Sequence, residues 1–115
     1  MKYSNKHFGQ ALHEQIKSKN IKLRSLANKT NLNYSYFSKL TRKSKPPPVE
    51  TMEIIASGLD IAPDYFLEYR LHKLNQLLTS YPSITDQVIS YAHRLASKED
   101  LKIAEEDKKF TKKEK

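Results

Sequence analysis

The sequence predicts an all-α fold: five short helices, followed by one or two additional C-terminal helices. Two observations support this prediction. Apolar residues recur three and four residues apart in successive segments, which is the spacing of one helix face. Asparagines and prolines, which favour turns, interrupt the pattern between these segments. Most of the seven tyrosines follow the same helical spacing, and no strand-rich barrel pattern accompanies them.

Composition limits the classes of protein to which the chain can belong. Its 115 residues suit one domain with a small appendage, and 37% apolar residues suffice for a small helical core. The chain has no cysteine, so neither a disulfide framework nor a thiolate metal site is expected. No long apolar run is present, and we therefore expect no signal peptide, no membrane partner and a cytoplasmic location.

The two halves of the chain differ sharply in charge. Residues 1–48 contain 11 Lys and Arg against one acid, Glu14, which gives +10. Residues 49–115 contain 10 Lys and Arg against 12 acids, which gives −2. A solubility function alone would not separate the signs in this way. The N-terminal half is expected to attract a polyanion.

The first expected helix runs to about Lys19, with Ser4 or Asn5 as its cap. Its buried stripe is expected to include Phe8 and Leu12. Asn20 is expected to end the helix, and the apolar residue after it is expected to pack against the core.

Residues 23–42 predict two short helices joined by a tight polar turn. Asn31 falls where the first of them ends, and Asn tolerates the left-handed conformation common at such ends. Leu32 is expected to point inward. Asn33 is expected to cap the second helix, because its side chain can accept from the amides two and three residues further on.

The second of these helices has two chemically different faces. At 100° per residue, Tyr36, Phe37 and Leu40 fall on one side. The opposite side contains hydroxyl groups, an amine and a guanidinium, from Tyr34, Ser35, Ser38, Lys39 and Arg42. Such groups match the base edges and phosphates of a DNA major groove.

The segment resembles the helix-turn-helix of the Cro/repressor-type (Xre-like) family of DNA-binding proteins. The matching positions are spread in order from about residue 8 to residue 67, and they are Leu26-Ala27, Leu32, Ser35-Tyr36-Phe37-Ser38, Leu40, Pro48, Thr51, Ile54-Ile55-Ala56, Leu59-Asp60-Ile61 and Pro63-Asp64. The resemblance implies a five-helix repressor-type domain over residues 1–67.

The resemblance also implies roles for individual residues. Those expected to face base edges are Tyr34, Ser35, Ser38 and Lys39. Those expected to contact the DNA backbone are Lys22, Arg24, Asn33, Arg42, Lys43 and Lys45. Leu23 stands where relatives grip the backbone through a side chain, so the helix amides are expected to contribute there.

The segment after the motif is expected to form a stiff connector and then two helices. Three successive prolines cannot continue a helix, and Pro48 suits the first turn of the next one, over residues 49–58. Gly58 fits either a helix end or a close helix contact. Pro63 and Asp64 are expected to start the fifth helix.

Residues 68–106 are expected to form a helical extension. Its first helix has a heptad-like seam, a break follows at Tyr81-Pro82, and Ser83 with Asp86 gives a capping pattern for a final helix. Two uses of the seam stay open, namely packing within the chain and a homodimer interface. The candidate interface residues are Leu71, Leu74, Leu78, Tyr81, Val88, Tyr91 and Leu95. Residues 107–115 are expected to be a disordered charged tail.

No catalytic or metal-binding constellation is identified, and neither an enzyme activity nor a cofactor is expected. The four histidines are scattered singly, and only two glycines are present. The sequence favours a sequence-specific double-stranded-DNA-binding transcriptional regulator, with repression as the expected mode. Two alternatives are an antitoxin or phage-type control protein whose C-terminal helices bind a protein partner, and a helical adaptor without DNA affinity.

Overall fold

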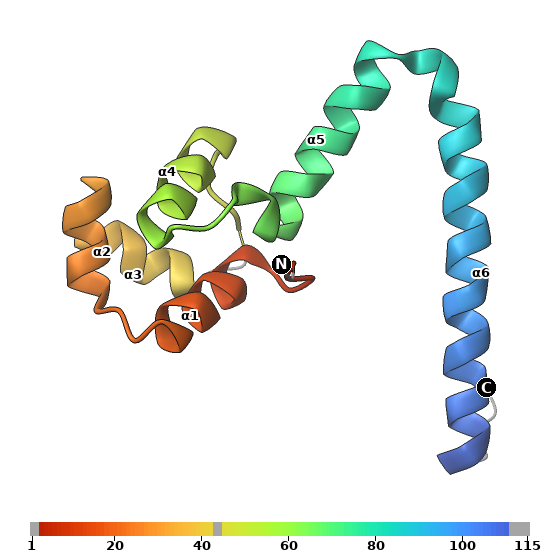
Figure 1. Ribbon diagram of the computed structural model, residues 1–115, viewed down its shortest axis with the longest axis horizontal. Coiled ribbons are helices and arrows are strands. Elements are labelled where there is room, and N and C mark those ends of the chain that lie inside the picture. The colour runs from red at the N-terminus through yellow and green to blue at the C-terminus, as the bar shows by residue number, and fades with distance from the viewer. Residues whose placement is uncertain (1–2, 43–44, 111–115) are drawn as a thin grey trace. The chain divides into compact units, whose positions relative to one another are not determined.

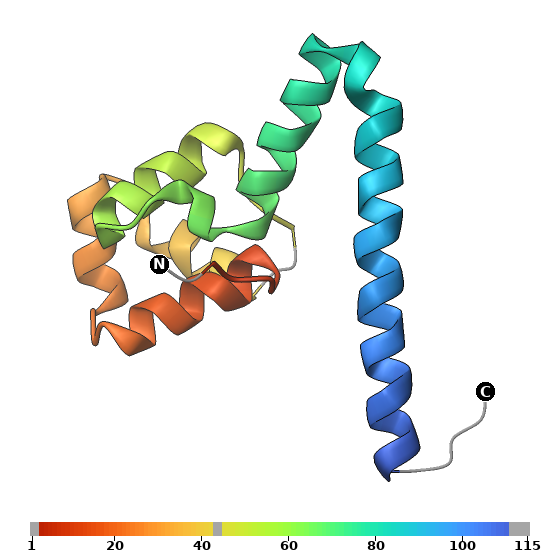
Figure 2. The ribbon, with the colours of Figure 1, turned by 45° about the vertical axis from the view of Figure 1, so that its right-hand side comes forward.

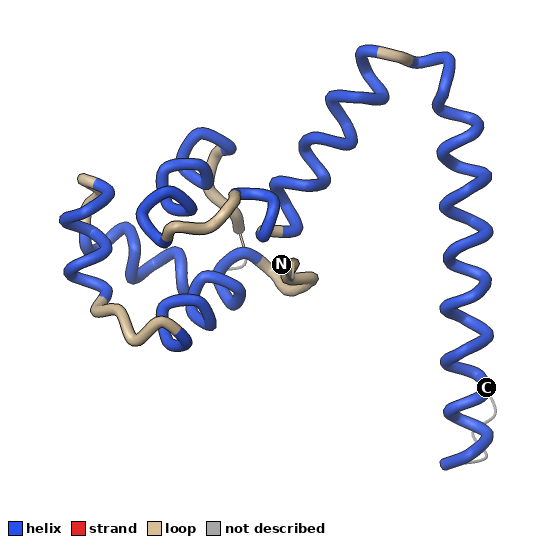
Figure 3. Tube along the Cα trace, in the orientation of Figure 1, coloured by secondary structure: helices blue, strands red, loops and turns tan. Residues whose placement is uncertain are grey.

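The computed structural model describes residues 3–42 and 45–110, and the side chains of residues 3–42 and 45–99. Those residues form helices and loops without a strand, which confirms the all-α prediction (Figure 3). The elements, in chain order, are α1 (Phe8–Ser18), α2 (Leu23–Thr30), α3 (Tyr34–Arg42), α4 (Val49–Leu59), the 3-10 turn η1 (Pro63–Tyr65), α5 (Leu67–Ser80), the 3-10 turn η2 (Pro82–Ile84) and α6 (Thr85–Phe110) (Figure 1).

The chain divides into two compact units, Met1–Gln76 and Leu77–Lys115. The boundary lies within α5, later than residue 67, where the DNA-binding domain was expected to end. The first unit keeps the early turns of α5 because their side chains bond to α4, to η1 and to the N-terminal segment.

A single hydrophobic core holds the first unit together. The rings of Phe8 and Phe66 meet at its centre, 4.4 Å apart between centroids. Figure 2 shows α1 to α4 gathered together, and each contributes to this core. Its buried members are Phe8, Ala11, Leu12, Leu26, Ala27, Phe37, Leu40, Met52, Ile55, Ala56, Leu59 and Phe66.

Three helices of this unit end in the same way. Asn20, Asn31 and Asp60 follow α1, α2 and α4 and have φ of 55°, 62° and 62°. After each of them an apolar residue donates its amide to a carbonyl five residues earlier, as Leu32 does to Ala27 at 3.0 Å. This is the Schellman arrangement, in which the apolar residue packs back onto the core. The expected ends at Asn20 and Asn31 are confirmed.

The expected cap of α1 is wrong. The helix begins at Phe8, after His7, and His7 provides no side-chain cap. Ser4 is buried instead, and its hydroxyl accepts from the amide of Lys6 at 3.1 Å. The Glu68 carboxylate, from α5, accepts from the amide of Phe8 and thus caps α1 from a distance.

Two proline positions also differ from the expectation. Pro48 precedes α4 with extended backbone, so it is the N-cap residue and not part of the first turn. Pro63 and Asp64 form η1, and the fifth helix begins only at Leu67. Between them Phe66 has extended backbone and a fully buried ring. The extended backbone at Phe66 thus separates η1 from α5.

Arg70 ties the start of α5 to the N-terminal segment. Its guanidinium donates to the carbonyls of Asp64 (3.0 Å) and Tyr65 (3.1 Å). It also donates to the carbonyl of Ser4 (3.0 Å) and to Oδ1 of Asn5 (2.8 Å). Several donors of one planar group thus satisfy oxygens from two segments far apart in sequence.

The second unit has no buried side chain from Leu77 to Glu99, the part whose side chains are described. The expected break at Tyr81-Pro82 is confirmed, but Ser83 lies in η2 and α6 begins at Thr85. The helix continues to Phe110, so residues 107–110 are helical and not the expected tail. Residues 111–115 lie outside the described part. None of the helices described is long and apolar enough to cross a membrane.

Candidate nucleic-acid interface

The candidate site is built on α2, the turn after it, and α3. α2 ends at Asn31, whose left-handed backbone reverses the chain direction. Leu32 then packs against the core and anchors the turn. Asn33 follows, and its Oδ1 accepts from the amide of Ser35 at 2.8 Å, which confirms the expected cap of α3. The turn and both helix ends are therefore fixed by local hydrogen bonds.

The buried side of α3 attaches the helix to the core. Phe37 is fully buried, and Leu40 is 6% exposed. Tyr36 is half-buried and packs against the same cluster. α3 contacts both α1 and α2, so its orientation is set by packing on two helices.

The outer side of α3 exposes the residues expected to face DNA. Tyr34 is 42% exposed, Ser35, Lys39 and Arg42 are also exposed, and Ser38 is half-buried. Their hydroxyl, ammonium and guanidinium groups therefore occur together on one short helix. The structure leaves these side chains accessible to a ligand, and their contact with DNA stays a prediction.

The start of α2 adds donors beside this face. Lys22 precedes the helix and makes no side-chain cap, so the first amides of α2 have no such acceptor. Lys22 and Arg24 are exposed, whereas Leu23 packs against the core. Free amides at a helix N-terminus, together with flanking cations, are suited to bind a phosphate.

One contact between the two helices was not foreseen. The Arg24 guanidinium carbon lies 4.5 Å from the centre of the Tyr34 ring, which is cation–π geometry. The expected backbone contact and the expected base contact thus form a pair in the folded chain. Sequence spacing gives no signal for this contact, because it depends on how the turn places α2 against α3.

Two further basic candidates lie on the connector after α3. Lys45 is exposed, in agreement with a phosphate-facing role. Lys43 lies outside the described residues. The first acid beyond Glu14 is Glu50, so the sequence from α2 through the connector contains cations and no carboxylate side chain.

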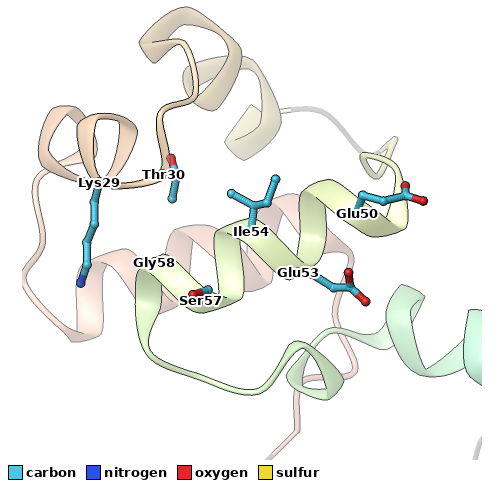
Figure 4. Close-up of a pocket in the computed structure, with 7 residues that line it drawn as sticks. All are labelled: Lys29, Thr30, Glu50, Glu53, Ile54, Ser57 and Gly58. Carbon is cyan, nitrogen blue, oxygen red and sulfur yellow. The ribbon is translucent and has the colours of Figure 1, made fainter.

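Shallow hollows occur elsewhere, along α4. Figure 4 shows one of them, with Ile54 and Ser57 on α4 and with Lys29 and Thr30 at the end of α2. No residue expected to contact DNA lines this hollow. In the described part of the chain no three His, Cys, Asp or Glu side chains group so as to hold a metal ion.

Within the first unit, α2 and α3 form a helix-turn-helix. The deciding geometry is the pair α2–α3, joined by the left-handed turn at Asn31 and anchored by Leu32, with the outer side of α3 exposed. This geometry agrees with the resemblance to Cro/repressor-type proteins that the sequence motif indicates.

Comparisons with solved structures give several structural neighbours of this chain, two of which are described here. No protein-family model and no curated protein matches it. It is similar to the restriction-modification controller protein C.AhdI from Aeromonas hydrophila, with 29% identity over 50% of this chain and 88% of that chain and a TM-score of 0.48. It is also similar to a chain of the SinR protein/SinI protein complex, with 20% identity over 81% of this chain and 98% of that chain and a TM-score of 0.48.

The residues expected at a dimer interface lie on α5, at the start of η2, and on α6. Leu71, Leu74, Tyr81, Tyr91 and Leu95 are exposed, and Leu78 and Val88 are half-buried. None of these apolar side chains is among those that form or pack against the hydrophobic core of the first unit.

Proposed function

We propose that this chain is a sequence-specific transcriptional regulator, acting as a repressor, that binds double-stranded DNA with α3 in the major groove. The observation that carries the proposal is the division of α3 into two faces. Phe37 and Leu40 are buried, while Tyr34, Ser35 and Lys39 are exposed on the other side of the same helix. Lys39 matches guanine O6 and N7, and the serines match several base edges.

The surrounding charges support a backbone-binding role for the start of α2 and for the end of α3. Lys22, Arg24, Arg42 and Lys45 are exposed, and the segment from α2 to the connector contains no acid. Phosphate contacts of this kind fix the orientation of a protein on DNA, and they make its affinity depend on salt.

The first experiment tests the role of α3. Duplexes bound by the protein are selected from a random pool, and the affinity for the selected site is measured by fluorescence anisotropy. In the variant Lys39→Ala/Arg42→Ala we expect both affinity and base preference to fall. In the wild type, log affinity should fall by about 0.9 for each unit of log salt and each phosphate neutralised.

A matched control removes the same charge from elsewhere in the unit. Lys17→Ala/Lys29→Ala changes two exposed lysines in the last turns of α1 and α2. It should weaken binding to all duplexes alike and leave base preference unchanged. If Lys39→Ala/Arg42→Ala binds each duplex with the same affinity as the wild type does, the proposed function is contradicted.

We further propose that the regulator is a homodimer. One domain of this kind covers only a few base pairs, and dimers solve this by binding two half-sites about one helical turn apart. The proposal is supported by exposed apolar side chains that recur three and four residues apart on α5 and α6. They include Leu71, Leu74, Tyr91 and Leu95. Large exposed apolar surfaces commonly mark interfaces.

The dimer is tested by mass in solution. Leu74→Glu should yield a monomer, whereas Gln76→Glu should leave the dimer intact. The second change adds the same charge about 200° further around the same helix. A monomeric wild type would contradict the dimer. A heterodimer with a different co-purified protein would instead favour the control-protein or antitoxin alternative.

A further inference from the structure

The first turn of α2 and the first residue of α3 are joined by a cation–π contact. The Arg24 guanidinium carbon lies 4.5 Å from the Tyr34 ring centre. The backbone between them is held by the left-handed turn at Asn31 and by the cap at Asn33. The stack therefore connects two exposed side chains on a fixed frame.

Both members keep their polar groups available. In the described part of the chain, neither the Arg24 guanidinium nor the Tyr34 hydroxyl has a hydrogen-bond or ion-pair partner. The single acid in residues 1–48, Glu14, is paired with Lys6 at 2.7 Å. A stacked guanidinium still directs its N–H groups outward in its own plane, where a phosphate can accept them.

We propose that Arg24 and Tyr34 act as one recognition element, with Arg24 on a DNA phosphate and the Tyr34 ring against the 5-methyl group of a thymine. This inference rests on the proposed function. A long flexible side chain loses conformational freedom when it binds a phosphate. Stacking on Tyr34 restricts Arg24 before DNA arrives, so less freedom is lost on binding.

The thymine methyl is the partner that the ring chemistry favours. Tyr34 opens the helix whose outer face is proposed to enter the major groove, and Arg24 covers one face of its ring. The uncovered face and edge are apolar, and the thymine methyl is the apolar group that base edges present in that groove. The rival contact is a hydrogen bond from the Tyr34 hydroxyl to a phosphate.

The test is a double-mutant cycle on the selected duplex. Arg24→Ala removes the cation and its stack on the ring, and Tyr34→Leu removes the ring. If the two residues act together, the double variant should weaken binding about two- to fivefold less than the product of the single effects, which is the size of a cation–π contact. If the loss of affinity in the double variant equals the product of the two single losses, the inference is overturned. Circular dichroism confirms that each variant is folded.

Two further arms identify the ligand of the ring. Tyr34→Phe keeps the ring and removes the hydroxyl, and it should change affinity less than twofold. Replacing one thymine of the site by deoxyuridine removes only the methyl group; at one position this should weaken the wild type and leave Tyr34→Leu unaffected. Equal losses for Tyr34→Phe and Tyr34→Leu would overturn the methyl contact in favour of the phosphate.

The outcome separates this inference from the proposed function. Suppose that binding is site-specific and depends on Lys39, but that the effects of the Arg24 and Tyr34 substitutions multiply fully. This result would contradict the inference and support the proposed function. A wild type that binds no duplex removes both. In the free protein, the Tyr34 ring resonances should shift in Arg24→Ala, and unchanged resonances would show that the stack is not formed in solution.

Discussion

The carboxylate of Glu68 accepts a hydrogen bond from the backbone amide of Phe8 at 3.1 Å, across 60 residues of sequence. A residue of α5 thus caps the first helix of the first unit. His7 has no side-chain cap to offer there. The side chain of Glu68 is only 17% exposed, so this acceptor is largely shielded from water.

Loss of this cap is expected to destabilise the first unit. Glu68→Ala should lower the free energy of unfolding by about 1–2 kcal/mol, because an amide of α1 loses its acceptor. Glu68→Gln keeps an acceptor oxygen and should cost less. Thermal and urea unfolding measure both, with Glu99→Ala on the exposed surface of α6 as the control. Equal stability of Glu68→Ala and the control would show that the cap contributes nothing.

Gly58 is expected to be required by close helix packing. A Cβ at this position would lie 2.5 Å from Cγ2 of Thr30 and 3.1 Å from Cδ1 of Leu26. Alanine favours helices by about 1 kcal/mol over glycine, but overpacking costs about 1–3 kcal/mol. Gly58→Ala should therefore leave the unfolding free energy unchanged or lower it by up to about 2 kcal/mol.

A second substitution isolates the clash at Gly58. Thr30→Ser removes Cγ2 and keeps the hydroxyl that donates to the carbonyl of Leu26 at 2.8 Å. In that background Gly58→Ala should be better tolerated than in the wild type, as measured by urea unfolding. If the effects of the two substitutions on the unfolding free energy simply add, the contact between the new Cβ and Cγ2 of Thr30 is not what makes alanine unfavourable at position 58.

The left-handed turn at Asn31 is expected to favour glycine over alanine. Its φ is 62°, a region that costs a residue with a Cβ roughly 1–2 kcal/mol and costs glycine little. Asn31→Ala should therefore lower the unfolding free energy by about 1 kcal/mol, and Asn31→Gly should change it by a few tenths. Asn28→Ala, an exposed helical position in α2, is the matched control and should not destabilise. Similar losses for alanine and glycine at Asn31 would argue against the turn.

The pair between Lys6 and Glu14 is expected to appear in a titration. The hydrogen bond from the Lys6 ammonium, at 2.7 Å, is the main cause that holds the pKa of Glu14 below its ordinary value, and the charge of Lys6 adds to it. The pair therefore stabilises the fold above the ordinary carboxyl pKa, and this contribution is lost as the pH falls through the lowered pKa. Carbon-13 NMR of the side-chain carboxyl measures this pKa. Lys6→Gln should return it to the ordinary range, and a normal pKa in the wild type would contradict the pair.

Much of the helix-turn-helix was predictable because its determinants are local. The left-handed end at Asn31, the cap at Asn33, and the two faces of α3 each depend on residues within a few positions of one another. The start of the fifth helix was not predictable in this way. Pro63 and Asp64 have the local signals of a helix start, yet burial of the Phe66 ring against Phe8 delays α5 to Leu67.

The sequence by itself determined where α1 and α2 end and which side of α3 meets the core, since apolar spacing and turn residues act over short range. Only the tertiary structure decided that Glu68 caps α1, that Arg70 holds the N-terminal segment, and that Arg24 stacks on Tyr34. These contacts join separate elements, and they exist only once packing has brought those elements within bonding distance. No pattern within a single helix encodes them.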